Sequence, residues 1–155
     1  MIVYDGQCPC GMVKFRCKGE PFFTQYCHCN KCREIGSASQ NERDKIGYAY
    51  TAAYLTNHFN MIAGENCLEA VIKNSSKLFL CSSCKSLIYG ISLDPAKQGG
   101  IGVNVNNFNF HGNLPDSFKP VRHIWYADRV IHFNDSLPKF KDAPKEQFGS
   151  GELLD

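Results

Sequence analysis

The amino-acid sequence predicts a mainly β fold with few short helical turns. Short stretches in which apolar and polar residues alternate recur along the chain, and glycine, proline and other turn-forming residues separate them. This pattern is typical of half-buried strands. Only residues 32–38 favour a short helical turn, and little else in the chain has a 3.6-residue period.

The strands are predicted one by one from this alternation. In residues 12–17, Val13, Phe15 and Cys17 fall on one face of an extended chain. Six further strands are predicted at residues 22–27, 48–54, 68–73, 77–81, 87–93 and 122–127. Residues 99–107 alternate apolar residues with glycine and asparagine, which predicts a strand that contains a tight bend.

The chain is predicted to form one domain over residues 1–144, followed by a flexible C-terminal tail over residues 145–155. A length of 155 residues is that of a single domain and suffices to bury a core without disulfides. The final segment is polar and rich in glycine, which is typical of a loose terminus. The hydrophobic content of 43% argues against disorder over most of the chain.

Composition also excludes several classes of partner. A formal net charge of +2 is too small to indicate a nucleic-acid surface. No apolar run approaches the length of a membrane-spanning helix. The first residues have neither the basic nor the apolar region of a secretory signal, so a cytoplasmic location is expected.

Nine cysteines are the unusual feature of the composition. Seven of them form three tight groups: Cys8 with Cys10, then Cys27, Cys29 and Cys32, then Cys81 with Cys84. A chain that stays in a reducing compartment uses such cysteines for metal binding or catalysis rather than for disulfides. The grouping therefore predicts metal sites.

The spacing favours two zinc ions per chain, in sites with different numbers of ligands. The three cysteines of residues 27–32 are local to one another, and the other four would tie together segments about 70 residues apart. A four-cysteine site is closed and usually structural, whereas a three-cysteine site leaves a coordination position open for substrate. The sequence thus indicates a structural site of Cys8, Cys10, Cys81 and Cys84 and a catalytic site of Cys27, Cys29 and Cys32.

Alternative interpretations of these residues remain open at this point. His28 could complete the second site and make both zinc ions structural, although in a Cys-His-Cys strand it would point away from the sulfurs. Cys17 and Cys67 are expected in the core, but either could also complete the open site. The pair formed by Cys81 and Cys84 could be a redox pair, but a strand rather than a helix is predicted to follow it.

The order and spacing of the motifs resemble the glutathione-dependent formaldehyde-activating enzyme family, which also contains centromere protein V. The matching segments are residues 6–15, 27–33, 81–84, 120–124 and 137–140, which together extend over nearly the whole chain. The combination is much more specific than a single Cys-x-x-Cys pair.

The resemblance implies a fold of antiparallel β-sheets stapled by a structural zinc. It matches Cys8, Cys10, Cys81 and Cys84 to structural ligands and the three cysteines of residues 27–32 to catalytic ligands. The implied activity is that of a carbon–sulfur lyase that joins glutathione to formaldehyde as S-hydroxymethylglutathione. The sequence departs from the family pattern at Leu80, Lys85 and His132, none of which is a predicted ligand.

The resulting hypothesis is an enzyme with small-molecule partners, a thiol and an aldehyde. Glutathione would be the co-substrate, and its thiol would lose its proton on the open zinc. Arg33 could bind a carboxylate of glutathione or could simply be solvated, and no acid–base residue is predicted among the histidines. The alternative function is a non-catalytic binding module that zinc stabilises.

Overall fold

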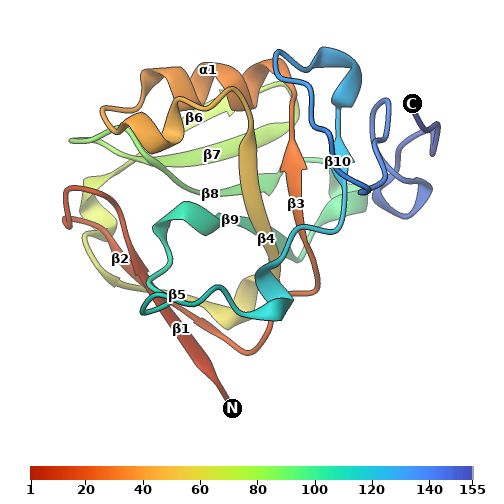
Figure 1. Ribbon diagram of the computed structural model, residues 1–155. Helices are drawn as coiled ribbons and strands as arrows, with labels where there is room; N and C mark the ends of the chain where they lie inside the picture. The colour runs from red at the N-terminus through yellow and green to blue at the C-terminus, as the bar shows by residue number, and fades with distance from the viewer. Residues whose placement is uncertain (155) are drawn as a thin grey trace.

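The computed structural model describes residues 1–154 as two β-sheets with one α-helix (Figure 1). The smaller sheet has the strand order β1-β2-β5 and the larger one β10-β3-β4-β9-β8-β7-β6. The elements are β1 (Val3–Gln7), β2 (Lys14–Lys18), β3 (Thr24–Cys27), α1 (Asn30–Ala38), β4 (Ala49–Leu55), β5 (Phe59–Ala63), β6 (Leu68–Lys73), β7 (Ser76–Cys81), β8 (Leu87–Ser92), β9 (Gly100–Asn104) and β10 (His123–Ile124). The prediction of a mainly β fold is confirmed.

The predicted alternation places the correct residues inside. In β2, Phe15 and Cys17 are buried, while Lys14, Arg16 and Lys18 are exposed. Nearly all strand pairs are antiparallel, as expected, and the exception is the short parallel pair of β10 with β3. That pair is parallel because the chain returns to β3 after a long excursion instead of through a hairpin.

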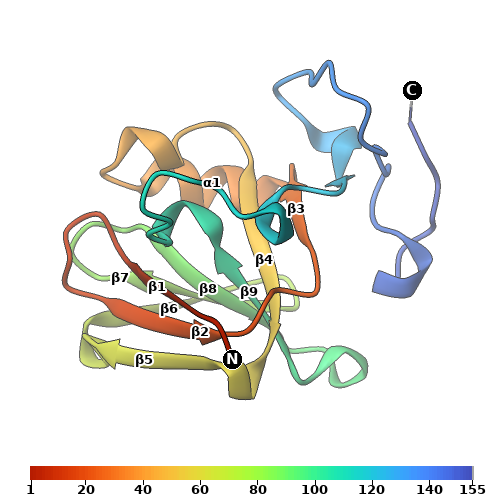
Figure 2. The same cartoon turned by 60° about the horizontal axis from the view of Figure 1, so that its bottom comes forward.

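The main core lies between the inner faces of the two sheets, which face each other in Figure 2. Its largest fully buried side chains include Phe15, Tyr54, Ile88, Val103 and Phe118. The ring of Phe108 packs edge-on against Phe15 of β2, with ring centres 5.1 Å apart, and in a tilted arrangement against Phe118, with ring centres 5.0 Å apart. Burial of each such side chain stabilises the fold by roughly 1.5–3 kcal/mol, so this core can hold the loops between the strands in fixed positions.

Two tight turns at the strand ends carry the first and last cysteine groups. In the β1–β2 loop, Gly11 donates its N–H to the carbonyl of Cys8 at 2.9 Å and adopts a left-handed φ of 80°. In the β7–β8 loop, Lys85 donates to the carbonyl of Cys81 at 2.9 Å and adopts a φ of 62°. A left-handed φ favours glycine, which explains physically why glycine is common in the family at the position of Lys85.

The helix α1 begins two residues before the predicted turn, at Asn30, with Cys29 as its N-cap residue. Its one buried residue is Ile35, so the helix covers the sheet through a narrow apolar contact. Two strands, β1 and β5, were not predicted from the sequence. Helix α1 starts where β3 ends, and this junction carries the middle cysteine group (Figure 1).

The C-terminal residues pack beside β10 and β3. The backbone N–H of Lys141 donates to the carbonyl of Glu152 at 2.8 Å, and Phe140 pairs with Leu153 in an isolated bridge. The side-chain amide of Gln147 reaches Gln25 of β3 at 3.2 Å. The domain boundary at residue 144 and the flexible tail stay predictions. Over residues 1–154, none of the helices has both the length and the apolarity needed to cross a bilayer.

Candidate metal centre

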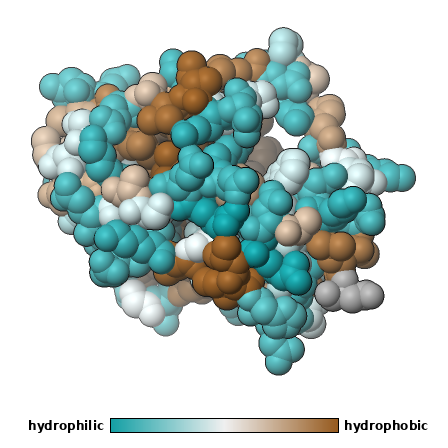
Figure 3. Space-filling model, turned by 90° about the horizontal axis from the view of Figure 1, so that it is seen from above, coloured by the Kyte–Doolittle hydropathy of each residue, from teal (hydrophilic) through white to brown (hydrophobic). Residues whose placement is uncertain are grey.

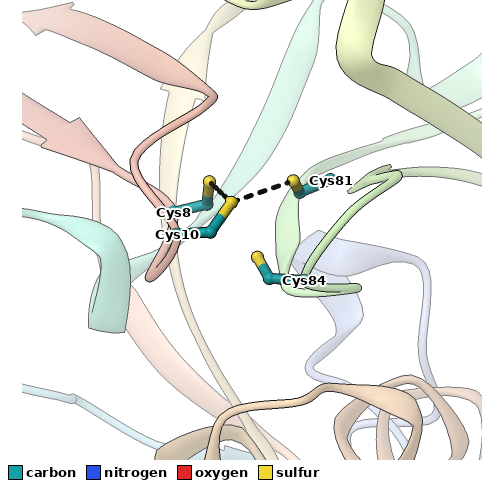
Figure 4. Close-up of side chains that lie close together, drawn as sticks. All are labelled: Cys8, Cys10, Cys81 and Cys84. Atoms are coloured by element: carbon teal, nitrogen blue, oxygen red, sulfur yellow. Dashed lines mark hydrogen bonds between the residues drawn. The ribbon is translucent and has the colours of Figure 1, made fainter.

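Four sulfurs from two loops that are distant in the sequence converge on one another (Figure 4). The sulfur of Cys10 lies 3.4 Å from that of Cys8 and 3.6 Å from that of Cys81. With Cys84, all four ligand atoms lie within 4.8 Å of one another and could hold a metal ion. Zinc–sulfur bonds of 2.3 Å place the sulfurs of a tetrahedron about 3.8 Å apart. The donor set and its spacing therefore fit a closed zinc site.

The backbone around these four sulfurs is arranged to stabilise thiolates. The N–H of Val13 points at the sulfur of Cys8 at 3.4 Å. Burial raises the pKa of Cys10, but hydrogen bonds from the Met12 backbone N–H and from the neighbouring thiols outweigh burial and lower that pKa to about 7. Cys84 behaves oppositely, since burial raises its pKa to about 12. A metal ion would supply the positive charge that allows all four cysteines of this mostly buried cluster to be thiolates.

The second cluster is formed by Cys27 at the end of β3, Cys29 at the N-cap of α1 and Cys32 in its first turn. The sulfur of Cys29 lies 3.4 Å from that of Cys27 and 3.3 Å from that of Cys32. These three ligand atoms could also hold a metal ion. Cys27 and Cys29 are buried and Cys32 is half-buried. Three sulfurs at this spacing cover three corners of a zinc tetrahedron.

The hydrogen bonds of this cluster favour a thiolate at Cys29. Hydrogen bonds from the thiols of Cys27 and Cys32, together with a backbone N–H of the helix start, lower its pKa to about 3. Because Cys27 donates its proton to Cys29, this hydrogen bond raises the pKa of Cys27 to about 12. The positive end of the α1 dipole also favours an anion at this position.

His28 does not join the second cluster. It is fully buried, and its Nε2 lies 2.9 Å from Nδ1 of His123 on the neighbouring strand β10. In turn, Nε2 of His123 lies 2.9 Å from Oδ2 of Asp135, whose other oxygen accepts from Lys139 at 2.7 Å. The alternation within the Cys-His-Cys segment thus directs His28 away from the sulfurs, as the sequence indicates. The histidines, Asp135 and Lys139 form one hydrogen-bonded chain from the interior to the surface.

This chain of side chains favours neutral histidines. Burial lowers the pKa of His28 to about 4. Burial also lowers the pKa of His123, although the carboxylate of Asp135 opposes the shift. Because Nε2 of the neutral His123 donates its proton to the carboxylate, Nδ1 of His123 has no proton and must accept from Nε2 of His28. The neutral His28 therefore carries its proton on Nε2 and none on Nδ1. That Nδ1 has no hydrogen-bond partner within residues 1–154.

The neutral state of His123 predicts a loss of stability in acid. A folded-state pKa below the usual value near 6.5 means that the unfolded chain takes up a proton first as the pH falls, so stability present at about pH 7 is lost toward about pH 5. Replacing His123 with glutamine should cost about 1–3 kcal/mol at pH 7, because Asp135 and His28 lose a partner. Urea unfolding should show that the difference in the free energy of unfolding between the wild type and His123→Gln becomes smaller at pH 5. The control is His132→Gln, since His132 is exposed. A free-energy difference that is the same at pH 7 and pH 5 would contradict the neutral state of His123.

A cleft of about 860 Å³ opens beside Cys29. Its floor is formed by β3, β4, β9 and β8, and its walls are the start of α1, the β6–β7 turn and the C-terminal segment. Lys31 and Trp125 line it, and neither was predicted as a site residue. Lys31 also donates to Ser76 at 2.6 Å, so it joins the helix start to the opposite wall. The position of Lys31 between the predicted ligands Cys29 and Cys32 could have indicated its place at the site. Nothing in the sequence pattern indicated that Trp125 would lie there.

The other candidate residues lie elsewhere. Arg33 does not line this cleft; it contacts the side-chain oxygen of Asn30 on the side of α1 that faces Lys45. Cys17 is fully buried in the main core, where burial raises its pKa to about 12. Cys67 is half-buried against the same core, and neither of these cysteines belongs to a cluster that could hold metal within residues 1–154.

Comparisons with known proteins support a family assignment for the chain. Residues 3–128 match the model of the family described as glutathione-dependent formaldehyde-activating enzyme. The fold is similar to that in a crystal structure of a Rhodobacter sphaeroides protein, with a TM-score of 0.53 and 20% sequence identity, over 77% of this chain and 98% of that one. No curated protein matches the chain. Because the family match covers well over half of the 155 residues and includes both cysteine clusters, the chain belongs to the glutathione-dependent formaldehyde-activating enzyme family.

Proposed function

We propose that this protein is a zinc-dependent carbon–sulfur lyase-type enzyme that makes or cleaves a glutathione–aldehyde adduct, as an S-hydroxymethylglutathione synthase does. The observation that carries the proposal is the three-sulfur cluster whose central member, Cys29, lies at the wall of a large cleft. Cys8, Cys10, Cys81 and Cys84 would hold one zinc for structure, and Cys27, Cys29 and Cys32 would hold the other for catalysis. A cytoplasmic location is part of the proposal, because a reducing compartment keeps all these ligands as thiols.

The difference between the clusters supports different roles. The first offers four sulfurs within 4.8 Å, which complete a tetrahedron, and the second offers three. A zinc ion in the three-sulfur cluster would supply one open position at which a substrate thiol binds and loses its proton. Lys31, on the same wall of the cleft, places a positive charge where it can attract a carboxylate of glutathione.

Charge indicates what the chain itself contributes to the reaction. Four thiolates around one Zn²⁺, three from the protein and one from the substrate, carry a net charge of −2, which disfavours strong polarisation of an aldehyde oxygen. The cleft residues therefore act by holding the thiol sulfur and the aldehyde carbon close together. When the carbon–sulfur bond forms, the carbonyl electron pair moves to oxygen, which takes up a proton equivalent to the one that the thiol released.

Titration with glutathione, followed at the zinc absorption edge, tests the proposal. We expect about two zinc ions per purified chain, and we expect saturating glutathione to add one sulfur neighbour to one of them. The Cys67→Ser variant is the control, because its thiol lies outside both clusters. No change in sulfur coordination at saturating glutathione, or a single zinc per chain, would contradict the proposal and favour a zinc-stabilised binding module.

A further inference from the structure

The floor of the cleft beside Cys29 has almost no side chains at its centre. Gly102 of β9 pairs with Ala53 of β4 on one side and with Gly90 of β8 on the other. All three residues line the cleft. The neighbours of Gly102 along β9, Ile101 and Val103, are buried in the core on the opposite face of the sheet. The residues of this row across three strands therefore carry no side chain larger than the methyl group of Ala53, and Leu78 reaches over Gly90 at its edge.

The fold does not need glycine at position 102. A Cβ on Gly6 would lie 2.3 Å from the ring of Phe15, and one on Gly90 would lie 2.7 Å from Leu78, so packing explains both of those glycines. A Cβ on Gly102 would meet nothing nearer than Thr51 at 3.7 Å, which is an ordinary contact, and its φ is not positive. Glycine inside a strand costs roughly 0.5–1 kcal/mol relative to alanine and often marks a place where a ligand approaches the backbone.

Exposed aromatic rings surround this floor. Phe22, Trp125 and Phe148 expose 68%, 43% and 62% of their surfaces, and all three line the cleft. Trp125 and Phe148 also have left-handed φ values of 54° and 65°, which are rare for bulky residues and gather at ligand sites. Figure 3 shows apolar side chains in several separate groups on a largely hydrophilic face, so no single apolar patch covers that face.

The charged side chains of the cleft suit glutathione, whereas its exposed aromatic rings suit an apolar group that glutathione lacks. The cleft walls carry two positive side chains, Lys31 and Lys97, and two negative ones, Asp128 and Glu146. These can pair with the carboxylates and the ammonium group of glutathione. Neither glutathione nor the single carbon of formaldehyde has an apolar body that would cover three exposed rings. A cleft of about 860 Å³ lies in the upper part of the range that holds drug-sized ligands, roughly 300–1,000 Å³.

We propose that the cleft holds a flat apolar group attached to the glutathione sulfur, so that the aldehyde partner of this protein is an aromatic aldehyde rather than formaldehyde. Gly102 is then a specificity-determining residue, because its missing side chain leaves room for the ring. This inference rests on the proposed function for the identity of the thiol. The step is the same addition: the thiolate sulfur bonds to the aldehyde carbon, and the carbonyl oxygen takes up one proton.

A matched pair of thioethers tests the ring site without any zinc-bound thiol. Trp125 is the single tryptophan of the chain and lines the cleft, so its fluorescence reports binding. We expect S-benzylglutathione to bind at least about tenfold more tightly than S-methylglutathione, because only the benzyl compound buries a ring. In Gly102→Val, a side chain would occupy the floor, and the tenfold preference should disappear while the methyl compound binds as before.

Stability measurements separate this effect from damage to the fold. Valine favours strands and glycine does not, so Gly102→Val should melt at or above the wild-type temperature. Gly102→Ala is the smaller variant and should show an intermediate preference if valine proves too large for the strand. The matched control is Asn60→Val at an exposed position of β5 outside the cleft, which should leave the preference unchanged.

The outcomes distinguish this inference from the function on which it rests. Equal affinities for the two thioethers in the wild type would overturn the ring site, even if glutathione adds a sulfur to zinc. A benzyl preference that survives in both Gly102 variants would overturn the role of Gly102. A clear benzyl preference without any added sulfur at zinc would keep the ring site and contradict the proposed chemistry.

Discussion

Replacing Cys81 with serine is expected to abolish cooperative unfolding of the purified protein. Cys81 is fully buried, ends β7 and lies 3.6 Å from the sulfur of Cys10 in a loop 71 positions away. Serine is a poor zinc ligand, so the closed site would lose its metal, and a structural zinc contributes folding free energy directly. The loss should be at least about 5 kcal/mol, which equals the whole stability of many domains. Thermal melts followed by circular dichroism, together with zinc analysis, measure it.

The control for this experiment is Cys67→Ser. Cys67 is half-buried beside the same core but belongs to neither cluster, so its replacement should cost less than about 1.5 kcal/mol. If Cys81→Ser melts cooperatively within a few degrees of the wild type, the four-sulfur cluster is not what holds the two loops together.

The substitution Cys29→Ser should have the opposite profile, with a large loss of thiol binding and little loss of stability. Cys29 precedes α1 as its N-cap residue, and the backbone N–H of Cys32 at the helix start bonds to its sulfur. Serine is among the best N-cap residues, so the helix start should be preserved. Loss of one ligand should weaken glutathione binding at least about 100-fold, because even groups behind the ligands contribute 10- to 100-fold. Calorimetric titration with glutathione and a thermal melt of the same sample give both values.

Comparison of the two variants decides between an enzyme and a binding module. A catalytic three-sulfur site predicts that only Cys81→Ser destabilises the fold strongly. Equal destabilisation by Cys29→Ser and Cys81→Ser would mean that both clusters are structural. The single variants suffice for this test because the clusters share no ligand.

The grouping of sulfurs could be predicted from the sequence because cysteine spacing limits which residues can meet. Cys27, Cys29 and Cys32 lie within six positions, so a tight junction between a strand and a helix brings them together. Most strands could likewise be predicted, since their faces alternate. Strand β1 could not, because Gly6 looks like a turn residue. Its glycine is explained only by the ring of Phe15, which a Cβ would meet at 2.3 Å.

The rest of the site depends on contacts between distant segments. His28 and His123 are 95 positions apart and meet only because β10 returns to pair with β3. Trp125 lines the cleft for the same reason, since it follows β10 directly. Local pattern contains no information on such pairings, so the hydrogen-bonded chain and the cleft walls could not be predicted.

The closed cluster also sets an order of events during synthesis. Cys84 lies past the middle of a chain of 155 residues, so the N-terminal hairpin must wait with two uncapped thiols until β7 and the turn after it have been made. The three sulfurs of residues 27–32 need no such wait, because they belong to one short segment. A nascent chain can therefore present the three-sulfur cluster to zinc before all ligands of the four-sulfur cluster have been made.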